Sequence, residues 1–139
     1  MNSCALKIAK ENLKKIKTQN PGHTLGHAWF KKSNLFSALG KQKFDFVAFN
    51  PPYVPSESGQ AMKWVDLDGG ENGVEVINEF ICAVGKHLNK NGVVLLLVSS
   101  LNNPKKIMAD LKKQGFNVKV VGRNKLFFEE LIVLRVRNS

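Results

Sequence analysis

The sequence predicts an α/β fold: an open, Rossmann-like sheet that is mostly parallel and ends in an antiparallel carboxyl-terminal hairpin. Three observations lead to this prediction. Helical and strand-like hydrophobic patterns alternate along the 139 residues. The segments between the earlier strands are long enough to hold crossover helices, which favours parallel pairing. The last two strands are joined by a connection too short for a crossover, so they should pair antiparallel.

The first predicted elements are an amphipathic helix and a short strand. Apolar residues recur at helical spacing on one face of the helix while lysines take the other: Leu6, Ala9, Leu13 and Ile16 against Lys7, Lys10, Lys14 and Lys17. Pro21-Gly22 ends this helix. Leu25 to Phe30 is predicted to be a short strand.

The middle of the chain predicts a strand, a helix and a second strand. Phe44 to Phe49 is nearly all apolar, as expected of a strand covered on both faces. Asn91-Gly92 should close the helix that follows, and Val93 to Val98 is expected to be a buried strand. The helix is marked by apolar residues at helical spacing, namely Val74, Ile77, Phe80, Ile81, Val84 and Leu88.

The carboxyl-terminal third predicts one more helix and the hairpin. Asn103 is placed to cap the helix, with Pro104 at its first position and Gly115 as its stop. Asn117 to Val121 and Leu131 to Val136 are the expected hairpin strands. Between them, Phe127 and Phe128 are interpreted as core or rim packing, with shaping of a substrate entrance as the alternative.

Composition indicates one folded domain over residues 1–139, with 43% apolar residues and no apolar run that could span a bilayer. No signal peptide is recognised, so a cytoplasmic location is expected, with Cys4 and Cys82 as buried free thiols. Acids and histidines lack a compact ligand spacing, so no metal site is predicted; Glu75 and the acids before it are interpreted as a loop and helix amino terminus.

The net charge is +10, and residues 1–44 hold nine lysines against one acid, Glu11. Most of these lysines are interpreted as a solvated helix face. The alternative is a basic flank that guides the protein to a ribosome-associated or RNA-like target, so nucleic acid stays a possible partner.

Asn50-Pro51-Pro52-Tyr53 directly follows the Phe44 to Phe49 strand, at the carboxyl edge where open sheets bind ligands. The two prolines stiffen the backbone and remove N–H donors. The Asn50 side-chain oxygen and the Pro51 backbone oxygen could therefore accept both hydrogens of a substrate NH2 group, and Tyr53 could stack on it. This geometry would aim a nitrogen lone pair at an electrophile without a general base.

The residues Asp45 to Tyr53, reading DFVAFNPPY, resemble motif IV of class I, S-adenosylmethionine-dependent amino N-methyltransferases. Ser33 to Leu39 and Asp68 to Gly73 resemble two further segments of the HemK-like protein glutamine methyltransferases. The tail, from Val98 through Lys125 to Leu131, resembles their short archaeal and eukaryotic branch. Motif IV alone is shared with adenine N6-methyltransferases, so the combination is the more specific signal.

The resemblance implies methyl transfer from S-adenosylmethionine to the glutamine amide in the Gly-Gly-Gln loop of peptide-chain release factors. By position, Asn50, Pro51, Pro52 and Tyr53 would form the substrate-amide site. Asn34, with Leu35 beside it, matches the position of an aspartate near the cofactor adenine; Asn50 would also border the cofactor. Some relatives pair with a small zinc-binding activator, for which the Leu25 to Phe30 edge with Trp29 is the expected docking surface.

The chain departs from these relatives at its beginning. The relatives carry a first strand, a glycine-rich cofactor loop and a ribose-binding acid before the position matched by Asn2. We therefore expect an amino-terminally truncated domain, from an incomplete gene model or as a remnant, with weak cofactor binding by the isolated chain. A nucleic-acid adenine N6-methyltransferase, a lysine acceptor and a non-catalytic fragment remain the alternatives.

Overall fold

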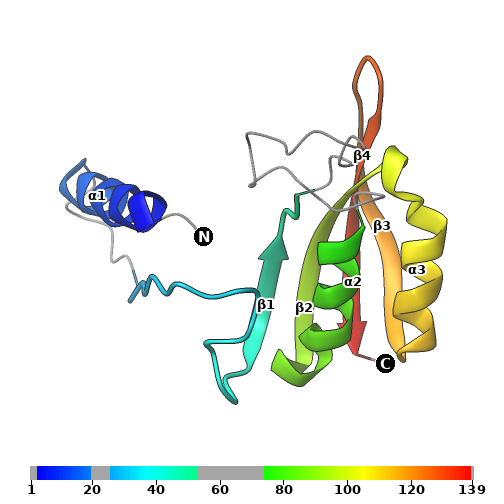
Figure 1. Cartoon of the computed structure of the whole chain (residues 1–139), viewed down its shortest axis with the longest axis horizontal. Helices are drawn as coiled ribbons and strands as arrows, with labels where there is room; N and C mark the ends of the chain where they lie inside the picture. Colours follow the sequence, from blue (N-terminus) through cyan, green and yellow to red (C-terminus); the bar gives the residue numbers. More distant parts are fainter. Residues whose placement is uncertain (1–2, 20–25, 53–73, 139) are drawn as a thin grey trace, which may run out of the picture. The chain divides into compact units, whose positions relative to one another are not determined.

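The computed structural model describes residues 3–19, 26–52 and 74–138, and the chain divides into two units, Met1–Gly40 and Lys41–Ser139 (Figure 1). The first unit holds helix α1 (Ser3–Gln19). The second unit holds, in order, β1 (Phe44–Phe49), α2 (Glu75–Val84), the 3₁₀ turn η1 (Gly85–His87), β2 (Leu88–Ser99), the 3₁₀ turn η2 (Ser100–Asn102), α3 (Pro104–Lys113), β3 (Phe116–Lys125) and β4 (Glu130–Asn138).

Helix α1 is amphipathic as predicted, with exposed lysines and half-buried Leu6, Ala9 and Leu13. Ile16 was expected on the same apolar face, but its side chain is exposed. The predicted strand at Leu25 to Phe30 is wrong, because the described residues 26–30 have no regular secondary structure. A strand needs a neighbouring strand that supplies ladder hydrogen bonds, and the sheet is built from other segments.

The second unit contains a four-stranded sheet in the order β1-β2-β4-β3 (Figure 1). β1 pairs parallel with β2, and β4 pairs antiparallel with both of its neighbours, β2 and β3. Strands β1, β2 and β3 therefore share one direction, and β4 runs against them. The predicted α/β sheet, mostly parallel with an antiparallel hairpin at the carboxyl-terminal end, is confirmed.

The core lies on one face of this sheet, beneath α2 and α3 (Figure 1). A valine row crosses all four strands on that face, because Val47 pairs with Val94, and Val136 pairs with both Val94 and Val118. Helix α2 contributes buried Ile77, Phe80, Ile81 and Val84, and α3 contributes buried Ile107 and Leu111. Burying these apolar side chains supplies most of the favourable free energy of this unit.

Within the second unit, the described helices leave the opposite face of β1 uncovered. Phe46 is 57% exposed and Ala48 is also exposed. Within the described residues of the second unit, only one face of this strand is covered, where both were predicted to be. Helices α2 and α3 cover only the other face, and among the described residues β1 pairs with β2 alone, which makes it an edge strand.

The predicted end of α2 is also wrong. The helix stops at Val84, passes through η1, and Asn91-Gly92 lies inside β2 rather than closing the helix. Pairing with β1 is irregular here, since Phe44 pairs with Leu88 while Phe46 pairs with Val93. The bulge needs the glycine: a Cβ on Gly92 would stand 2.9 Å from the Phe44 backbone oxygen and 2.6 Å from Leu88 Cγ.

Helix α3 begins and ends as predicted. The Asn103 side chain accepts a hydrogen bond from the Lys106 backbone N–H at 3.3 Å, and Pro104 follows at the first helical position. Gly115, with φ +85°, stops the helix. The prediction of buried cysteines is wrong, because Cys4 and Cys82 are both exposed.

Candidate active site

The candidate site lies at the carboxyl edge of the sheet. Because β1 and β2 are parallel, both strands end at this edge, with Phe49 opposite Leu96. The turn between β3 and β4 lies at the same edge, since Ser99 at the end of β2 pairs with Leu131 near the start of β4. Three connections therefore meet where ligands bind in open α/β sheets.

The structure places Asn50-Pro51-Pro52 directly after β1, as predicted. Asn50 is exposed, Pro51 is buried and Pro52 is half-buried. A buried, ring-constrained Pro51 fixes the backbone behind an accessible asparagine amide, which is the arrangement that a rigid pair of oxygen acceptors requires. Tyr53, the predicted stacking residue, lies outside the described residues, as do Asp68 to Gly73.

An aromatic stack anchors the end of β1. The rings of Phe49 and Phe80 lie 4.3 Å apart between centroids, with planes inclined by 22°. Phe80 comes from α2 and is only 2% exposed. The residue before Asn50 is therefore held against the core helix.

A polar cluster that the sequence analysis did not identify lies at the end of β2. Ser99 is fully buried; its Oγ donates to Glu129 Oε2 at 2.5 Å and accepts from the Leu101 backbone N–H at 3.2 Å. The Ser99 backbone N–H donates to Asn102 Oδ1 at 3.2 Å, which completes a capping box. The Ser99-Ser100-Leu101-Asn102 run was the available signal, because serine followed three residues later by a polar amide is typical of such a cap.

The interpretation of Phe127 and Phe128, in the turn at this edge, as core or rim packing is wrong. Both rings are almost fully exposed and contact each other edge to face. A four-residue connection closed by the hydrogen bond from Leu126 N to Glu129 O, 2.8 Å long, points them away from the core.

The two predicted adenine contacts, Asn34 and Leu35, lie in a tight turn of the first unit. The Ser37 N–H donates to the Asn34 carbonyl oxygen at 3.0 Å, and Ser37 Oγ accepts from the Asn34 N–H at 3.2 Å. Leu35 has φ +46°, a left-handed conformation that is strained for a leucine. The Asn34 side chain is exposed, so its amide oxygen can accept a hydrogen bond from an amino group.

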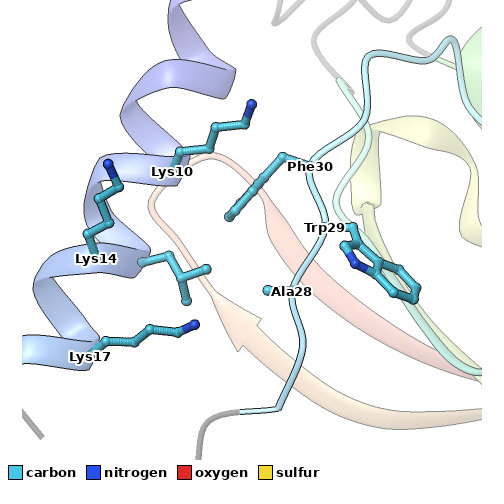
Figure 2. Close-up of a pocket in the computed structure, with 7 residues that line it drawn as sticks. Lys10, Lys14, Lys17, Ala28, Trp29 and Phe30 are labelled. Carbon is cyan, nitrogen blue, oxygen red and sulfur yellow. The ribbon is translucent and has the colours of Figure 1, made fainter. Parts of the chain in front are cut away.

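The first unit also contains a shallow cavity of about 490 Å³. Three α1 lysines line it together with the segment that follows the helix: Lys10, Lys14 and Lys17, with Leu13, Ala28, Trp29 and Phe30. Figure 2 shows the Phe30 ring directed toward α1 and the Trp29 ring directed away from it. Trp29 is 86% exposed. Lysines beside aromatic rings suit anionic or planar ligands.

Two features are absent from the described ranges 3–19, 26–52 and 74–138. Those residues contain no group of three or more His, Cys, Asp or Glu side chains able to hold a metal ion. No helix in the same ranges is long and apolar enough to cross a bilayer. Glu75, the described acid of the loop-and-helix prediction, lies in the first turn of α2 as expected.

A family model described as the methyltransferase small domain matches residues 1–128. A Methanocaldococcus jannaschii protein, named a candidate protein N5-glutamine methyltransferase, is 39% identical over 137 residues, which are 96% of this chain and 65% of that protein. A Gloeobacter violaceus release factor glutamine methyltransferase is 31% identical over 111 residues, covering 74% of this chain and 37% of that protein. The chain thus spans less than two thirds of either relative.

Among solved structures, the chain resembles a protein of the E. cuniculi Mtq2–Trm112 complex, which methylates the translation termination factor eRF1. The TM-score is 0.65 at 26% identity, and the match covers 95% of this chain and 79% of that one. The resemblance in fold agrees with the observed sheet, in which an antiparallel strand lies near the end of an otherwise parallel arrangement.

Proposed function

We propose, from the premise that this chain belongs to the methyltransferase small domain family and to its HemK-like group, that it methylates a glutamine side-chain amide in a peptide-chain release factor. The observation that carries the proposal is the placement of Asn50-Pro51-Pro52 at the carboxyl edge, with Pro51 buried and Asn50 accessible. The names of the two relatives and of the structural neighbour support the substrate class.

The proposed mechanism rests on two oxygen acceptors. The Asn50 side-chain oxygen and the Pro51 backbone oxygen accept the two N–H hydrogens of the glutamine amide, and so orient its nitrogen. An amide nitrogen is a poor nucleophile, so the rate depends on alignment and on stabilising the positive charge that develops on nitrogen. Tyr53 is proposed to stack on the planar amide. The ring of Phe49 stacks on the ring of Phe80, and this contact fixes the position of the two oxygen acceptors that follow Phe49.

S-adenosylmethionine is the proposed methyl donor; when bound, it supplies an electrophilic methyl group on a sulfonium. Asn34 and Leu35 are proposed to contact its adenine. Asn50 is proposed to border the cofactor. The Asn34 side chain suits this role, because its exposed amide oxygen can accept a hydrogen bond from the exocyclic amino group of adenine. The positive φ of Leu35 fixes the turn that presents this amide.

The proposal also covers the domain organisation, the cellular location and a partner subunit. The two units act as one methyltransferase domain, which is supported by a family match that runs across both. The protein works in the cytoplasm, where translation factors are found. A small zinc-binding activator subunit docks on residues 26–30, where Trp29 is exposed; the solved Mtq2–Trm112 complex supports a partner of this kind.

The experiment incubates the purified chain, with and without an activator subunit, with a release factor and a large excess of isotopically labelled S-adenosylmethionine, because weak cofactor binding is expected of this chain. Mass spectrometry should find the label as N5-methylglutamine in the Gly-Gly-Gln loop. A single-stranded oligonucleotide rich in adenine serves as the second substrate, because the lysine-lined cavity near Trp29 favours nucleic acid as the alternative. Label on adenine, and none on glutamine, would overturn the proposal.

A further inference from the structure

The turn between β3 and β4 carries two aromatic rings that contact each other and little else. Phe127 is 93% exposed and Phe128 is 87% exposed. Their centroids are 4.8 Å apart and their planes are inclined by 76°. Two adjacent aromatic side chains left in water are unfavourable unless a partner covers them, and aromatic residues are enriched at protein interfaces. We call residues 126–129 the hairpin tip.

Hydrogen bonds join the hairpin tip to the end of β2 and close the turn on itself. Ser99, which is fully buried, donates from Oγ to Glu129 Oε2 at 2.5 Å. Ser100 Oγ accepts from the Glu130 backbone N–H at 2.9 Å, and the Leu126 N–H donates to the Glu129 carbonyl oxygen at 2.8 Å. These hydrogen bonds hold the backbone of the turn that carries the two rings. A partner that binds the rings therefore orders less of the chain, and the entropy cost of binding is lower.

The hairpin tip lies at the same edge of the sheet as Asn50. Ser99, to which the tip is bonded, is three residues beyond Leu96, and Leu96 pairs with Phe49, the neighbour of Asn50. Asn50 thus follows β1 and the tip precedes β4, and β2 lies between these two strands in one continuous sheet of the same unit. The tip lies about 20 Å beyond the level of Phe49 along the strands, so a chain bound with one side chain at Asn50 would reach it with about seven extended residues.

The geometry and charge of the tip select a polypeptide. Because the rings meet edge to face, no slot separates them that could sandwich a flat base or adenine. Their outer faces can instead take an aliphatic side chain. Among the described residues of this hairpin, the charges are basic or already paired: Lys125 is exposed, and Arg123 binds Glu130 at 2.6 Å. The carboxylate of Glu129 is held by Ser99.

We propose that Phe127 and Phe128 dock an apolar segment of the substrate protein that lies about seven residues from the methylated glutamine, with Lys125 facing an acidic residue of that segment. The inference rests on the proposed function and adds to it a second contact for the same substrate. It assigns recognition of the substrate protein to the hairpin tip and chemistry to Asn50. Anchoring through exposed aromatic residues concentrates binding free energy in few contacts.

The test compares three double or single variants of the full chain: Phe127→Ser with Phe128→Ser, Phe127→Leu with Phe128→Leu, and Val121→Ser. Val121 is a half-exposed apolar residue of β3 in the same hairpin, and it is the matched control. Calorimetry gives the Kd for the release factor, and steady-state methyl transfer gives kcat and KM. The serine pair should raise Kd and KM by about 10- to 100-fold with kcat unchanged. The leucine pair should restore most of the affinity, and Val121→Ser should change neither constant.

A charge variant covers the case in which the serine pair disturbs folding. Lys125→Glu should raise Kd severalfold and reduce the salt dependence of binding, because it opposes the acidic residue of the substrate. Unchanged Kd and KM in the serine pair and in Lys125→Glu, with a wild type that methylates glutamine, would overturn this inference and leave the proposed function standing. A wild type that neither binds the release factor nor methylates it would remove both.

Discussion

The ring of Phe49 lies on the ring of Phe80, with 4.3 Å between their centroids. Phe49 is the last residue of β1 and the neighbour of Asn50, while Phe80 is buried in the middle of α2. The contact joins the residue next to the proposed acceptors to the helix that covers the core. Stability and catalysis should therefore both depend on it, but not to the same degree.

Replacing Phe80 with leucine tests this coupling. Phe80→Leu keeps an apolar side chain in the core but removes the stack, so unfolding in urea should show a loss of about 1 kcal/mol. The methyl-transfer rate should fall about tenfold, because Asn50 loses its fixed position. Ile77→Val is the control: it also shortens a fully buried α2 side chain and costs about 1 kcal/mol. Its rate should match the wild type, and an equal rate loss in both variants would contradict the coupling.

Gly92 should not tolerate a side chain. A Cβ at this position would stand 2.9 Å from the Phe44 backbone oxygen, and backbone at a strand pairing cannot easily move. Gly92→Ala should lower the free energy of unfolding by about 1–3 kcal/mol in a denaturant titration. Gly26→Ala, where an added Cβ meets nothing within 4 Å, should change it by less than about 0.5 kcal/mol. Equal costs at the two positions would show that the bulge does not need its glycine.

Asn103 combines a helix cap with a left-handed backbone, since its φ is +50°. Asn103→Ala should lower the free energy of unfolding by about 2 kcal/mol. It removes the side-chain cap, and alanine adopts the left-handed conformation less readily than asparagine does. Asn103→Gly should cost only about a few tenths of a kcal/mol, since glycine caps acceptably and adopts positive φ without strain. Thermal and urea unfolding of both variants would check the order. A greater loss of unfolding free energy in Asn103→Gly than in Asn103→Ala would contradict this explanation of how α3 begins.

The sequence predicted the elements whose patterns are local. Asn103-Pro104 at one end of α3 and Gly115 at the other marked its bounds, because capping and left-handed turns depend on the residues themselves. The hairpin followed from the short connection between its strands. Asn50-Pro51-Pro52 was found because two adjacent prolines after an apolar strand constrain the chain wherever it lies.

Features that depend on long-range neighbours were missed. The apolar run of β1 does not reveal that Phe46 faces solvent, because that depends on where the helices pack. The run around Leu88 suits a helix by spacing, yet pairing with Phe44 makes it the start of β2. The Ser99–Glu129 hydrogen bond joins residues 30 positions apart, so no local pattern could have indicated it.

The most direct test replaces Asn50 with alanine and measures the initial rate of methyl transfer to the release-factor glutamine, with the activator present. Asn89→Ala is the control, because Asn89 binds Asp45 at 2.7 Å near the other end of β1. Asn50→Ala should lower the rate by about 100-fold or more with its unfolding midpoint unchanged, while Asn89→Ala keeps the wild-type rate. A wild-type rate in Asn50→Ala would contradict the proposal that two fixed oxygen acceptors orient the amide.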